Sequence, residues 1–347
     1  MQSNRINTIL LGCLLFVAAC TPSHNSYLDA IGSPCSVLSP ESETDLEQMG
    51  IMMAVGISAQ GDWLLIKESG SEYLFRFVER YGTDNFPVIR KGRGPGEMAQ
   101  SSDAYCADGG FYLYENNEKM LLRMDVDRTV KARKAVLDTI GIYSQEPSFQ
   151  DPVCLGEGFL SLNLMDKDAW YVYRDGEGSV VNTVGFPDYP EAAIAPLDWT
   201  FLSGGKFVSD ISGRYSCRAM ASAAALSFGR LTGDGNFEET ARYEYEGPAV
   251  LRTEKGNLLD AKHAKRHFVG GCGTADCFYL LYSGQPMEGE DGKPVFEASH
   301  LVKYSLEGKQ MAHYMLDVPL LSVCTDGNSL WGLTTYPHCA IIRYPLP

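Results

Sequence analysis

The residues whose types could support metal chemistry are a histidine pair and a cysteine pair in the last third of the chain. His263 and His267 are four positions apart, so on a helix they would share one face and could bind one metal ion. The run from Lys262 to His267 is cationic and is expected to be a loop before a strand, which disfavours a metal site. Cys272 and Cys277 flank a tight turn, but zinc would need a second pair nearby. A cross-hairpin disulfide or two packed thiols fit this pair better.

Sequence motifs of known catalytic mechanism are absent from the chain. It contains no Gly-x-Ser-x-Gly elbow, no Walker loop and no His-Glu-x-x-His pair. The acidic run 288–292 does not have the spacing of an EF-hand loop and is expected to be a solvated hairpin tip. The motifs therefore predict no catalytic residue, no metal ligand and no cofactor.

The first twenty residues have the layout of an export signal. Arg5 precedes an apolar run over residues 9–17, which ends in Val-Ala-Ala-Cys at Cys20. The run is too short to span a bilayer, which takes about 20 apolar residues. The cysteine after small residues resembles a bacterial lipobox, in which the peptide is removed before the cysteine and the cysteine is lipidated. We therefore predict a signal peptide over 1–19 and a lipidated tether over 20–34 that anchors the chain to a membrane.

Composition and charge exclude several classes of protein. Hydrophobic residues make up 45% of the 347 residues, which is enough for a folded core. The net charge of −15 repels nucleic acid and anionic lipid head groups, so no nucleic-acid partner is expected. Ten cysteines occur, and those outside the signal and the lipobox would meet an oxidising compartment in which disulfides can form.

A strand–turn–strand pattern returns along the chain about every fifty residues. Each copy has a Gly/Asp-rich turn that suits a hairpin, followed by aromatic and aliphatic residues that favour strands. The clear copies begin at Ile57, Cys106, Cys154, Cys272 and Cys324. A degenerate copy over 206–228 fills the long gap and makes the count six, and a second alternating run after most hairpins gives four strands per unit. The sequence therefore predicts an all-β, six-bladed β-propeller with four-stranded antiparallel blades over 35–347.

The last copy has only three strands before the chain ends. They are expected near residues 321–324, 330–333 and 340–344. A closed ring needs a fourth strand, and the segment from Cys35 to Leu38 is predicted to supply it, which joins both ends of the chain in one blade. Cys35 would then lie beside the strand that carries Cys339, and a disulfide between these two cysteines is predicted to lock the ring.

The sharpest local motif is Arg90-Lys91-Gly92-Arg93-Gly94-Pro95-Gly96-Glu97. It resembles the GxGPGE turn of the TolB-like, six-bladed β-propeller lipoproteins of Bacteroides-type bacteria. In that family the motif ends the first blade and leads into the second, which is its position here. The lipobox and the six-copy spacing extend the resemblance over nearly the whole chain. The resemblance implies a fold, but the molecular role of that family is mostly undefined.

Arg93 and Glu97 are the candidate contact residues of this motif. Its glycines permit sharp turns and Pro95 fixes one φ angle, so both side chains could reach the mouth of the central channel. The alternative is an inter-blade crossover in which both residues hold neighbouring loops. A dinucleotide-binding loop fits poorly, because Glu97 occupies the place of the last glycine and no helix pattern follows.

Two classes of function fit this sequence. The first is a non-enzymatic lipoprotein propeller that binds a small ligand or an envelope protein, on the periplasmic side of an outer membrane in preference to the cell surface. The second is a metal-dependent, lactonase-like or lyase-like enzyme with its site at the channel mouth. Carboxylates or histidines that converge there from several blades would favour the enzyme, and their absence would favour the binding module.

Overall fold

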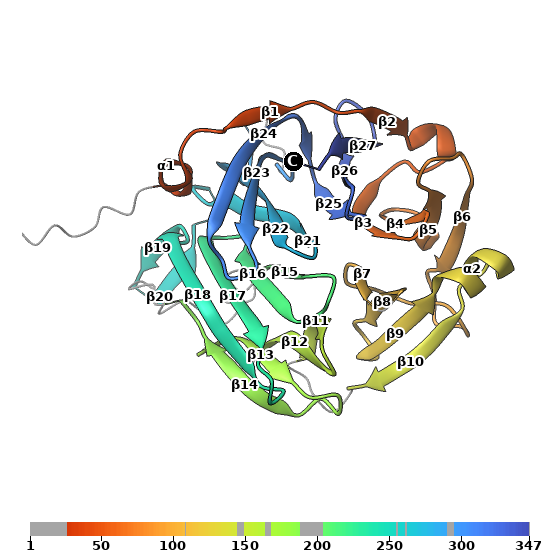
Figure 1. The fold of residues 1–347 in the computed structure, drawn as a ribbon, viewed down its shortest axis with the longest axis horizontal. Coiled ribbons are helices and arrows are strands. Elements are labelled where there is room, and N and C mark those ends of the chain that lie inside the picture. The colour runs from red at the N-terminus through yellow and green to blue at the C-terminus, as the bar shows by residue number, and fades with distance from the viewer. Residues whose placement is uncertain are drawn as a thin grey trace, which may run out of the picture.

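The chain folds into a closed ring of six β-sheets around a central axis (Figure 1). The computed structural model describes residues 26–107, 109–143, 149–163, 168–187, 204–254, 256–260, 262–289 and 295–346. Each sheet contains four antiparallel strands, and the sheets follow one another around the ring in chain order. The protein is therefore a six-bladed β-propeller, as the repeat predicts. The predicted signal peptide and Cys20 lie outside the described residues.

The first three blades each begin with the strand nearest the axis. Blade 1 is formed by β3 (Ala54–Gln60), β4 (Trp63–Glu68), β5 (Tyr73–Glu79) and β6 (Asn85–Arg90). Blade 2 is formed by β7 (Tyr105–Ala107), β8 (Gly110–Glu115), β9 (Met120–Asp125) and β10 (Leu137–Ile142). Blade 3 is formed by β11 (Phe149–Leu155), β12 (Gly158–Asn163), β13 (Ala169–Arg174) and β14 (Val180–Gly185).

The last three blades include the degenerate copy and both ends of the described chain. Blade 4 is formed by β15 (Gly205–Ser209), β16 (Tyr215–Met220), β17 (Ala224–Leu231) and β18 (Phe237–Glu246). A small hairpin of β19 (Val250–Thr253) and β20 (Gly256–Leu259) follows it. Blade 5 is formed by β21 (Lys265–Gly273), β22 (Cys277–Pro286), β23 (Ala298–Ser305) and β24 (Gln310–Leu320), with β1 (Ser36–Leu38) added. Blade 6 is formed by β25 (Ser322–Thr325), β26 (Ser329–Thr334), β27 (Ala340–Pro345) and β2 (Ser42–Asp45).

The hydrophobic core lies between neighbouring blades. The alternating strands turn one apolar face toward each adjacent sheet, so apolar side chains of two blades meet at the boundaries, in several cases as pairs of aromatic rings. Between blades 1 and 2, for example, the rings of Phe77 and Phe111 lie edge to face with their centroids 5.7 Å apart, and both side chains are fully buried. The blades are thus held together chiefly by large apolar side chains.

Helices form a small part of the described chain. They are α1 (Tyr27–Ile31), the 3₁₀ turn η1 (Glu47–Met49) and α2 (Val126–Ala132). The alternating run that follows Met120 is a strand only up to Asp125, whose side chain then caps α2 by accepting a hydrogen bond from the Arg128 amide at 2.8 Å. No helix in the described part of the chain is both long and apolar enough to cross a bilayer.

Strands from both ends of the chain close the ring, but the closing strand differs from the predicted one. The last copy does contribute three strands, and the fourth strand of blade 6 is β2, which pairs antiparallel with β27 so that Ser42 lies opposite Arg343. The segment predicted to close the ring, Cys35 to Leu38, instead places β1 parallel to β24 at the outer edge of blade 5. The chain thus covers the edge of blade 5 before it completes blade 6 (Figure 1).

Because β1 joins blade 5 and not blade 6, the two cysteines that were predicted to form a disulfide lie in different blades. Cys35 is exposed on blade 5, where its amide donates a hydrogen bond to the His313 carbonyl at 2.7 Å. Cys339 is buried in the core between blades 6 and 1, and its amide donates to the Glu47 carboxylate at 3.2 Å. Both are free thiols in the structure, so the predicted Cys35–Cys339 disulfide is not formed.

The C-terminal part of the predicted tether is folded onto the propeller. Tyr27 is fully buried, and its ring lies 4.4 Å from the Tyr282 ring and 5.1 Å from the rings of Tyr245 and Phe268. Its hydroxyl shares a hydrogen bond of 2.8 Å with the Tyr304 hydroxyl. Within the predicted tether, the part that begins at Tyr27 is thus held against the propeller, because this aromatic side chain docks between blades 4 and 5.

Candidate functional site

The GxGPGE motif forms the crossover between blades 1 and 2, as predicted. The Glu97 carboxylate folds back over the turn and accepts a hydrogen bond from the Gly94 amide at 2.8 Å. A Cβ atom on Gly92 would lie 2.0 Å from a Glu97 carboxylate oxygen, so a larger residue there would displace this carboxylate. Arg93 is exposed, and neither Arg93 nor Glu97 is among the described residues that line the central cavity. The motif thus lies in the crossover, where Glu97 holds its own turn and not a neighbouring loop.

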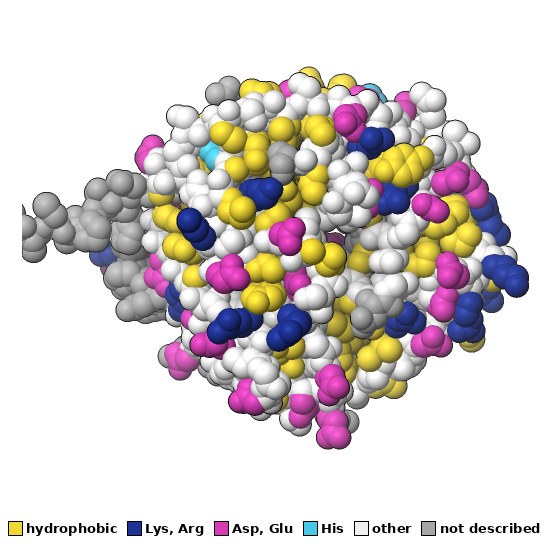
Figure 2. Space-filling model, viewed as in Figure 1, with side chains coloured by type: hydrophobic (Ala, Val, Ile, Leu, Met, Phe, Trp, Pro, Cys, Tyr) yellow, Lys and Arg dark blue, Asp and Glu magenta, His cyan; other side chains and the backbone are white. Residues whose placement is uncertain are grey.

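A cavity of about 570 Å³ occupies the centre of the ring. It is lined by the innermost strands of all six blades, β3, β7, β11, β15, β21 and β25. Figure 2 shows that the visible face is hollowed near the centre, with acidic and basic side chains interspersed around it. This volume lies within the range of about 300–1,000 Å³ that is typical of small-molecule sites.

The innermost strands run in the same direction along the cavity, which defines two ends. Ser58 donates a hydrogen bond to the Ala104 carbonyl at 2.7 Å, and the Cys106 thiol donates to the Ala59 carbonyl at 2.9 Å. β3 and β7 are therefore parallel neighbours. We call the end at which these strands begin the entry end, and the end at which they turn into their second strands the exit end.

At the entry end, three charged side chains from three blades form an ion-paired cluster. Asp103 precedes β7, and its carboxylate accepts a hydrogen bond from Lys67 of β4 at 3.0 Å and another from Lys206 at the start of β15. Blades 1 and 4 lie across the ring from each other, so the cluster bridges the channel (Figure 1). We call Lys67, Asp103 and Lys206 the entry triad.

The opposite charges of the entry triad stabilise one another. Burial alone would raise the pKa of Asp103, but the ammonium groups of Lys206 and Lys67 outweigh it and hold this pKa well below its usual range. The Asp103 carboxylate in turn raises the pKa of Lys206. Asp103 and Lys206 therefore stabilise each other in their charged forms, and the cluster places two ammonium groups against one carboxylate.

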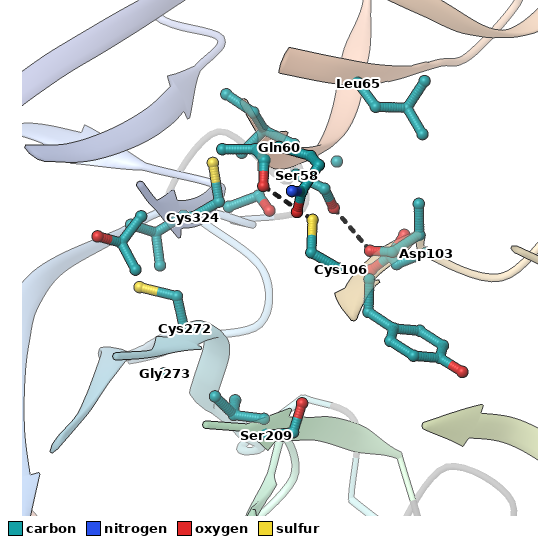
Figure 3. A pocket seen from close by; sticks show the side chains of 18 of the residues that line it. Ser58, Gln60, Leu65, Asp103, Cys106, Ser209, Cys272, Gly273 and Cys324 are labelled. Carbon is teal, nitrogen blue, oxygen red and sulfur yellow. Dashed lines mark hydrogen bonds between the residues drawn. The ribbon is translucent and has the colours of Figure 1, made fainter. Parts of the chain in front are cut away.

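The middle of the cavity wall carries three thiols from three blades. The side chains of Cys106, Cys272 and Cys324 lie around the same space (Figure 3). Burial raises the pKa of the Cys106 thiol to about 12, and it also raises the pKa of Cys272 and of Cys324. The three groups are therefore neutral thiols that behave as small apolar surface.

At the exit end, the carboxylates are already engaged by the protein. Asp326 accepts hydrogen bonds from Arg80 at 2.6 Å and from the amides of Asn328 and Ser329 at 2.7 Å each. Asp210 accepts from the amides of its own turn, among them that of Tyr215 at 2.8 Å. These carboxylates fix turns and tie blade 6 to blade 1, because Arg80 belongs to blade 1.

The described residues that line the cavity provide poor ligands for a metal ion. No histidine is among them, and their carboxylates, Asp103, Asp210 and Asp326, all have protein donors. Within the described part of the chain, no group of three or more His, Cys, Asp or Glu side chains could hold a metal ion. The arrangement therefore favours binding through lysine N–H groups and an apolar wall.

The histidine pair and the cysteine pair considered as metal ligands are engaged in packing and hydrogen bonds within the protein. His263 is bonded to Asp260 at 2.7 Å, whereas His267 is buried near the Tyr282 hydroxyl, and burial lowers the pKa of His267 to about 4. Cys272 and Cys277 are both free and buried, so they are packed thiols and not a disulfide. The two histidines have different partners and do not form a shared site.

The sequence contained a signal for the entry triad that the motif search missed. Lys67 follows the apolar run 63–66, and Lys206 directly precedes the strand residues Phe207 and Val208. A charge at a fixed place in the inner part of a blade repeat lies near the axis, where charges from distant repeats meet. A comparison of these inner positions across the six copies could have identified the two lysines as neighbours of the channel.

The carboxylates of the cavity give an expected acid dependence. The pKa of Asp326 is lowered because its hydrogen bonds to the amides of Ser329 and Asn328 and to the Trp331 side chain outweigh burial, and that of Asp103 is lowered by the lysines. A carboxyl whose pKa is depressed on folding adds stability above its unfolded pKa of about 3.9, and this stability is lost as the pH falls below that value. We expect Asp103→Asn to unfold more easily than the wild type at pH 7, and this difference should shrink between pH 4 and pH 2.

Denaturant unfolding of both proteins at several pH values measures this difference. Glu307→Gln at an exposed position serves as the control and is expected to track the wild type at each pH. A difference for Asp103→Asn that stays constant down to pH 2 would contradict the assignment of a depressed pKa.

Comparisons with known proteins agree with the propeller fold. The chain resembles the calcium-binding protein regucalcin from Agrobacterium tumefaciens, with 9% identity, a TM-score of 0.51, and coverage of 89% of this chain and 95% of that chain. It also resembles a putative exported protein from Bacteroides fragilis, with 11% identity, a TM-score of 0.49, and coverage of 89% and 98%. For BamB from Moraxella catarrhalis the values are 11%, 0.41, 84% and 85%. No protein-family model and no curated protein matches the sequence. At such an identity the likeness to regucalcin shows the fold alone.

Proposed function

We propose that the protein is a lipoprotein of the cell envelope whose β-propeller binds a small molecule in its central cavity. The acyl chains at Cys20 would anchor it on the periplasmic side of an outer membrane. The GxGPGE crossover supports kinship with the TolB-like propeller lipoproteins of Bacteroides-type bacteria. An envelope protein that docks on the ring is a second kind of partner for such a module.

The central cavity is the observation that carries the binding role. It has the volume of a small-molecule site, and its described wall residues combine apolar side chains with a few polar groups at its two ends. The described carboxylates of the lining already accept hydrogen bonds from protein donors, which lowers their capacity to bind a divalent ion or to act as a general base. Binding without chemistry is the function that this arrangement supports best.

Metal analysis of the purified full chain tests the binding role against the enzyme alternative. Protein prepared without chelator is expected to hold well below one metal ion per chain by mass spectrometry, and chelator should not change its thermal stability. One ion per chain, lost together with thermal stability on chelation, would contradict the binding module and favour a metal-dependent enzyme at the channel mouth.

Replacing Cys20 with serine tests the anchor. The wild-type protein is expected to take up a fatty-acid label, to begin at Cys20 and to leave the membrane fraction only with detergent. Cys20→Ser should take up no label and should keep its leader. Cys13→Ser is the matched control, because Cys13 lies within the predicted signal, and it should be labelled as the wild type is. Equal labelling of Cys20→Ser and wild type would rule out lipidation at this residue.

A further inference from the structure

We infer that the central cavity binds a small molecule with a carboxylate head and an apolar body, with the head on Lys67 and Lys206 at the entry end. This inference rests on the proposed binding role of the cavity and adds the chemical class and the orientation of the ligand. It is carried by the distribution of charge along the cavity, the spare donors of the lysines and the chemistry of the wall.

The charges that line the cavity are separated along its axis. At the entry end Lys67 and Lys206 pair with Asp103, while Asp151 and Arg218 also act on Lys206, so these five side chains leave one positive charge over. At the exit end Arg80 faces Asp210 and Asp326, so one negative charge is left over. In a chain with a net charge of −15, the entry end is thus a local positive site, and an anionic group is favoured there over the exit end.

The lysines have donors that the protein does not use. An ammonium group carries three N–H donors, and within the described part of the chain Lys67 and Lys206 each use one on Asp103. The carboxylates of the exit end, in contrast, are engaged by backbone amides and by Arg80. Unused hydrogen-bonding capacity is therefore concentrated where the positive charge is, and a carboxylate accepts from two ammonium groups at once.

Part of the wall between the two ends is apolar. Ile57, Val208 and Val323 contribute aliphatic side chains, and Cys106, Cys272 and Cys324 contribute neutral thiols. The glycine-rich stretch of β21 adds backbone with no side chain at Gly270, Gly271 and Gly273. This part of the wall suits an aromatic or aliphatic body.

Asp103 lies where the head would bind, so it opposes an anion while it positions both lysines. Converting it to a neutral side chain of the same shape should therefore tighten the binding of a carboxylate. This expectation separates a carboxylate-binding site from a purely structural ion pair, because loss of a structural pair alone would not improve binding.

The test uses 4-phenylbutyrate and its uncharged analogue 4-phenylbutyramide on the full chain in lipid nanodiscs, with empty nanodiscs as the blank. We expect the carboxylate to bind at least tenfold more tightly than the amide. Lys206→Gln should weaken the carboxylate about tenfold, which is the loss expected for one charge-assisted hydrogen bond. Lys206→Gln should leave the amide unchanged, and Asp103→Asn should tighten the carboxylate. Lys309→Gln is the matched control, because Lys309 is exposed in the turn between β23 and β24 of blade 5. It should behave as the wild type.

Thiol alkylation locates the probe within the molecule. Bound 4-phenylbutyrate should slow the reaction of Cys106, Cys272 and Cys324 with N-ethylmaleimide, as measured by peptide mapping, and should leave the exposed Cys35 unaffected. Equal protection by carboxylate and amide, with no effect of Lys206→Gln, would overturn the inference about the head group and leave the binding role of the cavity intact. Protection by neither compound would overturn the inference and count against the binding role as well.

Discussion

Tyr27→Ala is expected to lower the free energy of unfolding by about 3–5 kcal/mol, the cost of deleting a large buried aromatic side chain. Tyr27 is fully buried, and rings from two blades surround it. The backbone that follows is held less strongly, by the hydrogen bond of 2.9 Å from the Gln310 side chain to the Ile31 carbonyl and by that of 2.8 Å between His313 and the Gly32 carbonyl. Loss of the ring should therefore release the segment 26–34 from the propeller.

Tyr27→Phe is the matched control for this substitution. It keeps the ring and removes only the hydrogen bond to the Tyr304 hydroxyl, so the expected loss is about 1–3 kcal/mol. Denaturant unfolding gives both values, and limited proteolysis reports release of the segment. If the alanine variant were as stable as the phenylalanine variant and equally resistant to protease, the docking of this ring would contribute little.

Gly273→Ala is expected to destabilise the ring by about 3 kcal/mol, at the upper end of the usual cost of overpacking. A Cβ atom at Gly273 would lie 2.2 Å from the Ser209 carbonyl oxygen and 2.9 Å from the Asp210 Cα atom. Both contacts are with backbone, so no side-chain rotation can relieve them. The innermost strands of blades 4 and 5 would have to move apart, and the effect should appear as a lower thermal midpoint.

Gly233→Ala provides the comparison at a glycine without such constraints. No atom lies within 4 Å of a Cβ atom placed there, and the substitution is expected to change stability by less than about 0.5 kcal/mol. Equal thermal midpoints for Gly273→Ala and Gly233→Ala would show that blades 4 and 5 are not packed as closely as the structure has them.

The blade count could be predicted because each blade carries its own local signal. Turns such as that at Gly61, whose φ is 57°, and the aromatic runs after them mark hairpins whose partners are neighbours in sequence. The closing strand could not be assigned this way. Ser36–Leu38 and Ser42–Asp45 are both short, and their partner strands lie more than 270 positions away, so nothing local shows which of the two pairs with β27.

The candidate site was less predictable than the fold. Lys67, Asp103 and Lys206 meet only because the ring brings blades 1, 2 and 4 to one axis. Arg93 and Glu97 drew attention because their motif is compact, but that compactness reflects the hydrogen bond that Glu97 makes within its own turn. Tyr27 is a single aromatic residue in a polar stretch, and no periodicity distinguishes such a residue from one in a flexible linker.

The docking of Tyr27 also limits how far the propeller can stand from a membrane. Cys20 and Tyr27 are seven positions apart, and seven residues can extend over at most about 25 Å. With acyl chains at Cys20 in a bilayer, the rim beside α1 would stay within that distance of the lipid surface (Figure 1). A ligand of the central cavity would then be taken up close to the lipid surface.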